Sequence, residues 1–464
     1  MNAKFSAKLL CLGVVLSFIL QGCVDSSIPA DNIIEQKKVS EFEPTVALKW
    51  NELYLDVERN TDGYRPPISA RTLGYIGLAT YESVVNGMPE YKSLSGRYAG
   101  LVVPVAASNT VYHWPTVLNT CYSTSLRNFF PTAPASQIYK IYTLESSFNQ
   151  EFKTNLSDDV YNRSIDYGKR MADAVYAFSK TDATGHDAYL NPTDKNYVDG
   201  TQAGEWRRTA PDFTNPLLPN WGRVRTFAIN EDDKKIPAPI KYSESASSLY
   251  YQQGKEVQSI VNEVKSGKDY ENNWIAIFWS DDCAKLTFTP AGRWIAVSNQ
   301  IVRDHAKTLD KAIITYSKMG MALADAGIAA WNEKYRYKVQ RPIDYIRTVF
   351  GDKNWNTIMC PDGNGAYFTP PFPAYPSGHA TFGAAAAEVL TAEYGINVSM
   401  TDRCHEGRTE FIGTPRAFPN FYSMAEENAY SRIPIGVHWR MDSEQGVKLG
   451  YRVGRKVNDL PWKK

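Results

Sequence analysis

The sequence predicts an all-α fold. Apolar residues recur at intervals of three and four along most of the chain, a spacing that places them on one face of a helix. The alternating, β-branched pattern that is typical of strands is scarce. The chain of 464 residues is 43% hydrophobic and 22% charged, a composition that excludes a disordered or fibrous protein. Its length allows two or three domains, or one large helical domain.

The N-terminal half of the chain predicts five helices. Each has apolar residues at helical spacing, and the second begins with a Pro-Pro pair, a favourable helix start. The expected ranges are Thr45–Arg59, Pro67–Asn86, Asn109–Phe130, Ala135–Phe152 and Asp158–Ser179.

The segment from Thr181 to about Ser247 has no helical periodicity and is rich in Pro, Gly, Asn and Trp. So long a segment without secondary structure is uncommon in a compact fold. Because Trp206, Trp221 and Phe227 would be unfavourable in water, we expect ordered irregular chain packed on the core.

Helical periodicity returns after this segment and continues to the end of the chain. The expected ranges are Tyr250–Val264, Asn273–Trp279, Gly292–Thr308, Lys311–Tyr337, His379–Tyr394, Ala425–Ile433 and Asp442–Val457.

The N-terminus has the features of an export signal over residues 1–22. Two lysines precede an apolar run from Leu9 to Leu20, which is too short to span a bilayer but suits a signal peptide. The run ends in Leu-Gln-Gly-Cys, which resembles a bacterial lipobox, so we expect lipidation of Cys23; cleavage nearby without lipidation is the alternative. Residues 23–45 are polar and aperiodic and predict a tether. We expect a protein of the cell envelope that contacts a membrane only through this lipid.

The charge of the chain is nearly balanced, with 51 lysines and arginines against 50 aspartates and glutamates. Without a net positive field the chain is not expected to bind nucleic acid, and any small anion needs a local group of cations. Four cysteines remain in the folded part, and none forms a CxxC pair, so a zinc site is not expected. In an exported protein they can form two disulfides, with three pairings open, among Cys121, Cys283, Cys360 and Cys404.

A first candidate motif has the form K-x6-RP and contains Lys334, Arg341 and Pro342. The spacing of seven predicts both cations on one face of a helix, two turns apart. Pro342 is expected to stop or kink this helix and to leave Arg341 at its end. Taken alone, such a pair is more typical of a solvated helix face.

A second candidate motif is Pro-Ser-Gly-His, residues 376–379, at the start of a predicted helix. Ser377 is expected to cap the helix, and Gly378 allows close approach of a ligand to the main chain. Free N–H groups at a helix N-terminus favour an anion, and His379 is a candidate acid or base above it. The alternative is an ordinary helix cap with an incidental histidine.

A third candidate motif, SR-x5-H-x3-D, runs from Ser431 to Asp442. His438 and Asp442 are four residues apart, so on a helix the carboxylate would bond one imidazole nitrogen and aim the other at a metal or phosphorus centre. Arg432 adds a bidentate donor for an oxyanion. In isolation the pair is equally explained as a helix cap.

The three motifs together supply three cations, a helix N-terminus and two imidazoles, which are the groups that a tetrahedral oxyanion with an apical ligand needs. They resemble, without substitution, the signature shared by type 2 phosphatidic acid phosphatases, bacterial class A acid phosphatases and vanadium-dependent haloperoxidases. The resemblance implies that the oxyanion is bound by Lys334, Arg341, Ser377, Gly378 and Arg432, with His438 as its apical ligand.

This superfamily has a phosphatase branch and a haloperoxidase branch. In a phosphatase, His438 would be the nucleophile that forms a phosphohistidine, and His379 would protonate the leaving group. In a haloperoxidase, His438 would bind vanadium, His379 would assist the deprotonation of hydrogen peroxide, and Lys334 would polarise the oxidant. The cofactor would be vanadate, and phosphate is expected to compete for the same site.

The surroundings of the motifs resemble the haloperoxidase branch. The stretch from Phe372 to Gly383 is similar to fungal chloroperoxidases. Trp331 and Phe372 match the aromatic wall beside vanadate in that family, although both are equally explained as core residues. Asp282 matches a carboxylate that pairs with the second arginine, here Arg432, with the adjacent Asp281 as an alternative.

The resemblance also implies two helical bundles, with the active site mainly in the C-terminal one. We expect an N-terminal bundle with the long irregular segment over residues 46–250 and a second bundle over residues 251–464. The expected substrates are hydrogen peroxide and a halide, with iodide or bromide favoured, and an organic acceptor is compatible. Because the product would be hypohalous acid, we expect the four cysteines of the folded part to be disulfide-bonded or buried.

Two other functions compete with halide oxidation. A periplasmic acid phosphatase would use the same motifs, with His438 as nucleophile. A non-catalytic surface lipoprotein that binds glycans or peptides through Trp and Tyr is the third, but such a protein has no need of all three cations and both imidazoles.

Overall fold

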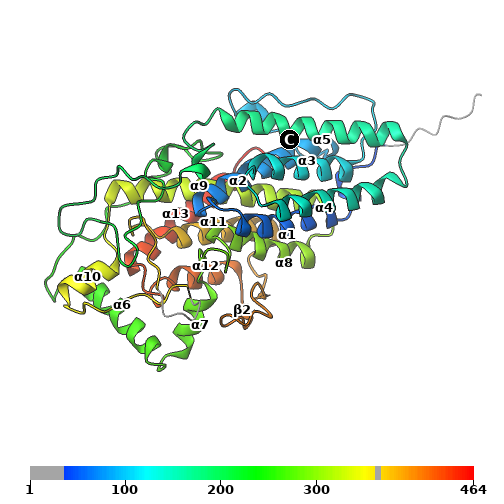
Figure 1. Ribbon diagram of the computed structural model, residues 1–464. Coiled ribbons are helices and arrows are strands. Elements are labelled where there is room, and N and C mark those ends of the chain that lie inside the picture. Colours follow the sequence, from blue (N-terminus) through cyan, green and yellow to red (C-terminus); the bar gives the residue numbers. More distant parts are fainter. Residues whose placement is uncertain (1–35, 361–366) are drawn as a thin grey trace, which may run out of the picture. The chain divides into compact units, whose positions relative to one another are not determined.

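The structure, a computed structural model, describes residues 36–360 and 367–464 (Figure 1). Residues 36–464 form one compact unit. Helices dominate it, and the described residues contain one small sheet, in which β1 (Met400–Asp402) pairs antiparallel with β2 (Arg416–Phe418). The predicted all-α fold is therefore confirmed. The export signal and the lipidation site at Cys23 lie outside the described residues.

Among the described residues, the twelve predicted helices occur in the predicted order with shifts of up to five residues at their ends, and α10 is an additional helix. The first five are α1 (Thr45–Asn60), α2 (Pro66–Val84), α3 (Trp114–Phe129), α4 (Ala135–Lys153) and α5 (Asp158–Lys180). The others are α6 (Leu249–Lys265), α7 (Tyr270–Phe278), α8 (Pro290–His305), α9 (Leu309–Tyr337), α10 (Pro342–Val349), α11 (Gly378–Tyr394), α12 (Phe421–Tyr430) and α13 (Arg440–Asn458).

Local chemistry explains where several of these helices begin. The side chains of Ser157, Ser248 and Thr289 accept hydrogen bonds from main-chain N–H groups in the first turns of α5, α6 and α8. Proline occupies the first or second helical position of α2, α3, α8 and α10, where its missing N–H group has no cost. Helix α3 begins at Trp114, five residues later than its periodicity predicted, with Pro115 in its first turn.

The long helix α9 lies at the centre of the fold. It packs against α2, α8, α11 and α13, and most of its 29 residues are buried. Helix α13 in turn packs closely on α11, because Gly446 and Gly450 face that helix. A Cβ on Gly446 would lie 2.7 Å from the carbonyl oxygen of Ser377, and one on Gly450 would lie 2.7 Å from the Cβ of Ala384. The main chains of the two helices are therefore in near contact.

The long segment between α5 and α6 is ordered irregular chain, as predicted, with only two short 3-10 turns. Trp206, Trp221 and Phe227 are all buried. The carboxylate of Asp325, in the middle of α9, accepts hydrogen bonds from the main-chain N–H groups of residues 227–229 at 2.7–3.1 Å. This contact fixes the irregular segment to the central helix.

The predicted tether over residues 23–45 is wrong at its C-terminal end. Val39 begins a short 3-10 helix and is fully buried in the core. The carbonyl oxygen of Phe42 accepts a hydrogen bond from the N–H of Leu309 at 2.8 Å, at the start of α9. Residues 36–44 therefore belong to the packed unit, because even a polar segment is anchored by one or two buried apolar side chains.

Candidate oxyanion site

Lys334 lies near the C-terminal end of α9 and is fully buried. Its Nζ donates hydrogen bonds to the carbonyl oxygens of Pro373, Ala374 and Pro376, at 2.9, 2.9 and 2.6 Å. The ammonium group therefore ties α9 to the segment that leads into α11 and places a positive charge beside that segment.

Arg341 is not on the same helix as Lys334, which corrects the prediction from their spacing. Helix α9 ends at Tyr337, because Lys338 adopts a left-handed conformation with φ of 48°. Arg341 immediately precedes α10, a helix that the sequence pattern did not predict. Pro342 begins that helix instead of ending the previous one.

The guanidinium group of Arg341 is fully buried among main-chain carbonyls. Its Nε donates to Phe372 at 2.9 Å and its Nη1 to Val437 at 2.8 Å. Its Nη2 is buried without a hydrogen-bond partner among the described residues. One donor of this cation is thus held in place by the other two and remains available to a ligand.

The start of α11 has the predicted cap. The hydroxyl of Ser377 accepts a hydrogen bond from the N–H of Ala380 at 3.3 Å, and Gly378 is the first helical residue. A Cβ on Gly378 would lie 3.3 Å from the indole of Trp331, so a side chain here would press on that ring. His379 is buried, and its Nε2 has no hydrogen-bond partner within the described parts of the chain.

His438 precedes α13 and is not itself helical, which corrects the expectation that it shares a helix with Asp442. The predicted contact is nevertheless present, because Asp442 lies in the first turn and its carboxylate turns back. Nδ1 of His438 is 2.8 Å from Oδ2 of Asp442, and the same oxygen accepts from the N–H of Trp439 at 3.0 Å. This contact places the imidazole proton on Nδ1. Nε2 therefore carries a lone pair, and this atom lies 3.1 Å from Nη1 of Arg341.

The second and third motifs meet through the main chain. The N–H of Ser377 donates to the carbonyl oxygen of Asp442 at 2.9 Å. The helix cap that presents His379 and the carboxylate that orients His438 are therefore held in one fixed relation.

Arg432 follows the end of α12 and is also fully buried. Its Nη1 donates to the carbonyl oxygen of Trp279 at 2.7 Å, and its Nη2 lies 3.8 Å from Sδ of Met359. Its Nε is a further buried donor without a partner among the described residues. Like Arg341, it keeps one N–H group free.

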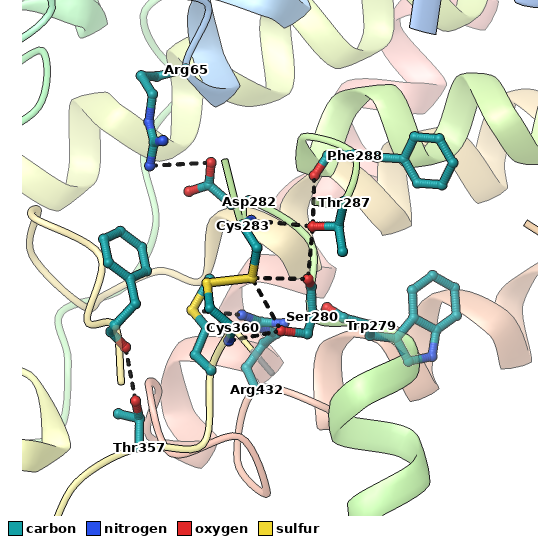
Figure 2. Close-up of a disulfide and its surroundings, with 12 residues drawn as sticks. Arg65, Trp279, Ser280, Asp282, Cys283, Thr287, Phe288, Thr357, Cys360 and Arg432 are labelled. Atoms are coloured by element: carbon teal, nitrogen blue, oxygen red, sulfur yellow. Dashed lines mark hydrogen bonds and ion pairs between the residues drawn. A yellow bond between two sulfur atoms is a disulfide. The ribbon is translucent and has the colours of Figure 1, made fainter. Parts of the chain in front are cut away.

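The predicted ion pair between Asp282 and Arg432 is not present. Asp282 instead lies 3.4 Å from Nη2 of Arg65, the residue before α2 (Figure 2). The alternative residue, Asp281, lies 3.8 Å from Nη1 of Arg293, in α8. Asp282 has a positive φ of 80°, and a sequence motif reveals neither this conformation nor the contact with the distant Arg65.

An aromatic wall stands beside the cations. The rings of Trp331 and Phe372 are 4.7 Å apart between centroids, and Nζ of Lys334 lies 5.1 Å from the Phe372 ring. The indole N–H of Trp331 donates to the carbonyl oxygen of Leu217 at 3.2 Å. The irregular segment between α5 and α6 therefore supports this wall from behind.

Burial dominates the electrostatics of the site. Burial, with repulsion from Arg341, lowers the pKa of Lys334 well below its ordinary value. Burial lowers the pKa of Arg341 to about 9 and that of Arg432 to about 10. Among the described residues, none of these three cations has a carboxylate within 4.0 Å. The site therefore holds positive charge that its nearest side chains do not neutralise.

The same causes keep both histidines neutral. Burial, followed by the charge of Arg432, lowers the pKa of His379, and burial, followed by the charge of Arg341, lowers that of His438. Burial raises the pKa of Asp442 to about 7. Two neutral imidazoles thus lie beside a group of buried cations.

These residues fit a tetrahedral oxyanion. The free donors are Nη2 of Arg341 and Nε of Arg432, with the helix N-terminus at Gly378 beside them, and an apical ligand on Nε2 of His438 would replace its hydrogen bond from Nη1 of Arg341. The described residues contain no group of three or more His, Cys, Asp or Glu side chains that could hold a metal cation. The chemistry of the donors therefore favours an anion with one imidazole ligand.

The cysteines divide into one disulfide and two free thiols. Cys283 and Cys360 are bonded to each other, and Cys121 is buried, as expected for a protein exposed to an oxidant. Cys404 is free and only partly buried, so the expectation of bonded or buried cysteines is wrong at this position. Its Sγ accepts a hydrogen bond from Gln300 at 3.1 Å.

Sequence reasoning missed the groups that hold the arginines. The carbonyls of Phe372, Val437 and Trp279 and the sulfur of Met359 carry no motif, because any residue supplies a carbonyl. Arg65 was also not predicted as a site residue. Its position directly before the Pro-Pro start of α2 is the sequence signal that could have indicated it.

A second group of buried charges lies next to the site. Nη2 of Arg293 is 2.9 Å from the carboxylate of Asp402, which belongs to β1, and both side chains are fully buried. Nη1 of Arg293 contacts Nε2 of His405 at 2.5 Å. We call Arg293, Asp402 and His405 the neutralised cluster.

Three comparisons with known proteins agree with this geometry. A protein-family profile described as the VCPO second helical-bundle domain matches residues 315–461. The vanadium chloroperoxidase of Curvularia inaequalis is 23% identical over 522 residues, covering 90% of this chain and 81% of that protein. A crystal structure described as the first bacterial vanadium-dependent iodoperoxidase matches with a TM-score of 0.80 and 26% identity, over 93% of this chain and 99% of that one. A holo bacterial vanadium-dependent chloroperoxidase has the same fold, with a TM-score of 0.62 and 14% identity over 90% and 94% of the two chains.

The fold and the site define an all-α enzyme with an oxyanion centre and two histidines. The matched domain contains all three motifs, and the relatives named above, each described as a vanadium-dependent chloroperoxidase or iodoperoxidase, match at least 90% of the chain. The chain is therefore similar to vanadium haloperoxidases over most of its length, and the family profile matches its C-terminal residues 315–461.

Proposed function

We propose that the protein oxidises a halide with hydrogen peroxide to hypohalous acid, with vanadate as its cofactor and iodide or bromide as its substrate. One observation carries the proposal: three buried cations without a carboxylate in ion-pair distance converge on a neutral imidazole, in the part of the chain that the structure describes. A site of this kind is stable when an anion supplies the missing negative charge.

Arg341, Arg432 and the N-terminus of α11 would hold the oxygens of vanadate, and Nε2 of His438 would be its protein ligand. Bound vanadate would supply the Lewis-acid centre at which hydrogen peroxide is activated toward the halide. Orthophosphate has the same shape and charge and is expected to compete for these donors.

The remaining residues control protons and water. Because His379 is neutral, its Nε2 can take a proton from hydrogen peroxide and return it to the oxygen that leaves as water. The overall reaction consumes one proton, one halide and one hydrogen peroxide and forms hypohalous acid and water. Lys334 adds positive charge, and the rings of Trp331 and Phe372 exclude solvent from one side.

Iodide is the halide we favour, with bromide next. The structure with the iodoperoxidase description has the higher TM-score, 0.80 against 0.62 for the chloroperoxidase. Iodide is also more easily oxidised than bromide or chloride, so it needs the least activation of the peroxide.

The test is peroxide-dependent iodide oxidation by purified protein, before and after addition of orthovanadate. We expect activity only with vanadate, and we expect His438→Ala to reduce it to the background rate. His305→Ala, which removes an exposed histidine at the end of α8, is the matched control and should keep full activity. Activity in His438→Ala equal to that of the wild type would overturn the proposal.

An acid phosphatase is the second candidate, because Nε2 of His438 is equally placed for attack on phosphorus. Vanadate-free protein would then hydrolyse a chromogenic phosphate ester at a high rate, and vanadate would inhibit it. Robust hydrolysis together with no iodide oxidation would favour this candidate over the haloperoxidase.

We further propose that the protein is exported and anchored to the cell envelope through lipid on Cys23. The basis is the signal-like sequence of residues 1–22 and the cysteine that follows it. In the described residues no helix is both long and apolar enough to cross a membrane. Mass spectrometry of the mature N-terminus tests this, since Cys23→Ala should abolish the lipid modification.

A further inference from the structure

One short stretch of chain, residues 279–283, supports several groups of the site. The carbonyl oxygen of Trp279 accepts the hydrogen bond from Nη1 of Arg432. The main chain of Asp281 contacts the imidazole of His379, and Asp282 pairs with Arg65. We call residues 279–283 the support segment.

A second stretch, residues 357–360, approaches Arg432 from another side. Sδ of Met359 lies 3.8 Å from Nη2 of the guanidinium group, and the N–H of Ile358 donates to Ile435 at 3.1 Å, three residues after Arg432. The guanidinium group therefore has one contact on each stretch. We call residues 357–360 the second arm.

The disulfide joins these two stretches beside Arg432 (Figure 2). Cys283 ends the support segment, and Cys360 directly follows Met359. The N–H of Cys360 also donates to the hydroxyl of Ser280 at 3.3 Å, so the covalent bond and a hydrogen bond fix the same junction. The two cysteines are 77 residues apart in sequence, and no helix contains either of them.

We propose that the Cys283–Cys360 disulfide is a positioning element of the oxyanion site, which holds the support segment and the second arm at the spacing that Arg432 needs. When the bond is absent, the two stretches separate and the free Nε of Arg432 loses its fixed direction. The affinity for a tetrahedral oxyanion then falls. This inference rests on the proposed oxyanion site but not on halide oxidation.

A disulfide also stabilises a fold in a general way, by restricting the unfolded chain. That effect does not depend on Arg432 and leaves the affinity of the folded protein for an anion unchanged. The two roles therefore separate when binding is measured well below the unfolding temperature and when Arg432 is removed.

The experiment compares wild-type protein with the double variant Cys283→Ser and Cys360→Ser. The dissociation constants of orthophosphate and orthovanadate are measured by calorimetry at a temperature where circular dichroism shows both proteins folded. We expect about tenfold weaker binding in the double variant, the effect typical of removing a group that orients a ligand-binding side chain. Cys121→Ser removes a buried free thiol in α3 and is the matched control, with unchanged binding.

The decisive comparison repeats this measurement in an Arg432→Met background. If the disulfide acts through Arg432, its removal there changes affinity by less than about twofold. An equal loss in both backgrounds, or no loss in the first, would overturn the inference. A lower unfolding temperature with unchanged affinity would show a merely structural bond and would overturn it as well.

Two further measurements keep the test informative. If the double variant does not fold, wild-type and Arg432→Met proteins are reduced with a phosphine, which becomes the phosphine oxide with oxygen from water as each sulfur becomes a thiol, and orthophosphate is the probe. Binding of both anions by wild-type protein without iodide oxidation would contradict the proposed function alone. No binding of either anion by the wild-type protein would overturn both.

Discussion

Two neighbouring regions of this protein bury arginines completely, but only one of them pairs its arginine with a carboxylate. In the neutralised cluster, Arg293 lies 2.9 Å from Asp402, and this contact lowers the pKa of Asp402 although burial opposes it. In the oxyanion site, Arg341 and Arg432 contact main-chain carbonyls and have, among the described residues, no carboxylate within 4.0 Å. Burial lowers their pKa values to about 9 and about 10.

The presence or absence of a paired carboxylate distinguishes a buried arginine with a structural role from one that binds a ligand. A buried ion pair supplies its own counter-charge, so it needs no ligand and leaves no donor directed at one. Buried cations with free N–H groups and no counter-charge are unfavourable in the isolated protein and favourable once an anion binds. The absence of a paired carboxylate is therefore the feature that marks the site.

Asp281 lies between the two regions and shows how the fold keeps them apart. It is 3.8 Å from Arg293 and also acts on Arg432 at longer range, and neither of its carboxylate oxygens has a hydrogen-bond partner in the described structure. Burial raises its pKa to about 7 in spite of both arginines. Below about pH 7, where Asp281 is mostly protonated, its carboxyl group does not neutralise Arg432, and that charge is left to the bound anion.

The largest expected effect is on anion binding, and it belongs to the oxyanion site. Arg341→Met should weaken the binding of orthophosphate and orthovanadate by about 100-fold or more, because it removes a buried donor and its charge. Calorimetric titration measures this. The exposed Arg170, which forms an ion pair with Asp166 on α5, gives the control Arg170→Met, with unchanged binding. Anion binding within threefold of wild type in Arg341→Met would remove Arg341 from the site.

The next effect is on stability, and it belongs to the neutralised cluster. Asp402→Asn should lower the free energy of unfolding by about 3–5 kcal/mol, since it leaves Arg293 buried without a counter-charge. Urea unfolding monitored by circular dichroism measures this. Asp166→Asn breaks an exposed ion pair and should change it by less than about 1 kcal/mol. Equal effects of the two substitutions would contradict the distinction between the regions.

The smallest effect concerns the pH dependence of stability and belongs to Asp281. Its pKa in the folded protein, about 7, is above its ordinary value of 3.8, so the folded state binds the proton more tightly than the unfolded state does. The stability from this proton is complete below pH 3.8 and is lost as the pH rises through about 7. Asp281→Asn keeps the neutral form, so its stability relative to wild type should increase across this range.

Unfolding free energies of wild type and Asp281→Asn at a series of pH values from 4 to about 8 check this expectation. Glu58→Gln is the comparison, because Glu58 is also buried with a pKa raised to about 7 but lies outside both regions. A difference between wild type and Asp281→Asn that is constant with pH would show that Asp281 does not titrate in this range.

The sequence predicted which residues form the site better than it predicted the helix boundaries and contact partners around them. Ser377 caps α11 and His438 meets Asp442 because both relations are local, within five residues. The periodicity predicted the end of α9 at Tyr337, but the K-x6-RP spacing wrongly placed Arg341 on the same helix. The spacing does not reveal that the main chain after Tyr337 bonds to a distant partner: the carbonyl of Lys338 accepts from the N–H of Trp206 at 2.6 Å. A helix that continued to Arg341 would lose that contact with the irregular segment.

The pairing of charges and cysteines escaped prediction for the same reason. Arg65 and Asp282 are more than two hundred residues apart, and only long-range packing brings them together. Three pairings of the four cysteines into two disulfides were left open, and nothing in the spacing of the cysteines favours the bond from Cys283 to Cys360. Motifs specify which groups a site needs, whereas long-range packing decides what surrounds them.

The glycines of α13 have a consequence for anyone who wishes to alter this protein. Gly446 and Gly450 let α13 touch the main chain of α11, so Ser377 and His379 on one helix keep a fixed distance from the turn that carries His438. A side chain in place of either glycine would meet the main chain or an alanine of α11 and push the helices apart. For protein engineering, this helix pair is the fixed frame, and the aromatic wall of Trp331 and Phe372 is the part that substitutions can reshape.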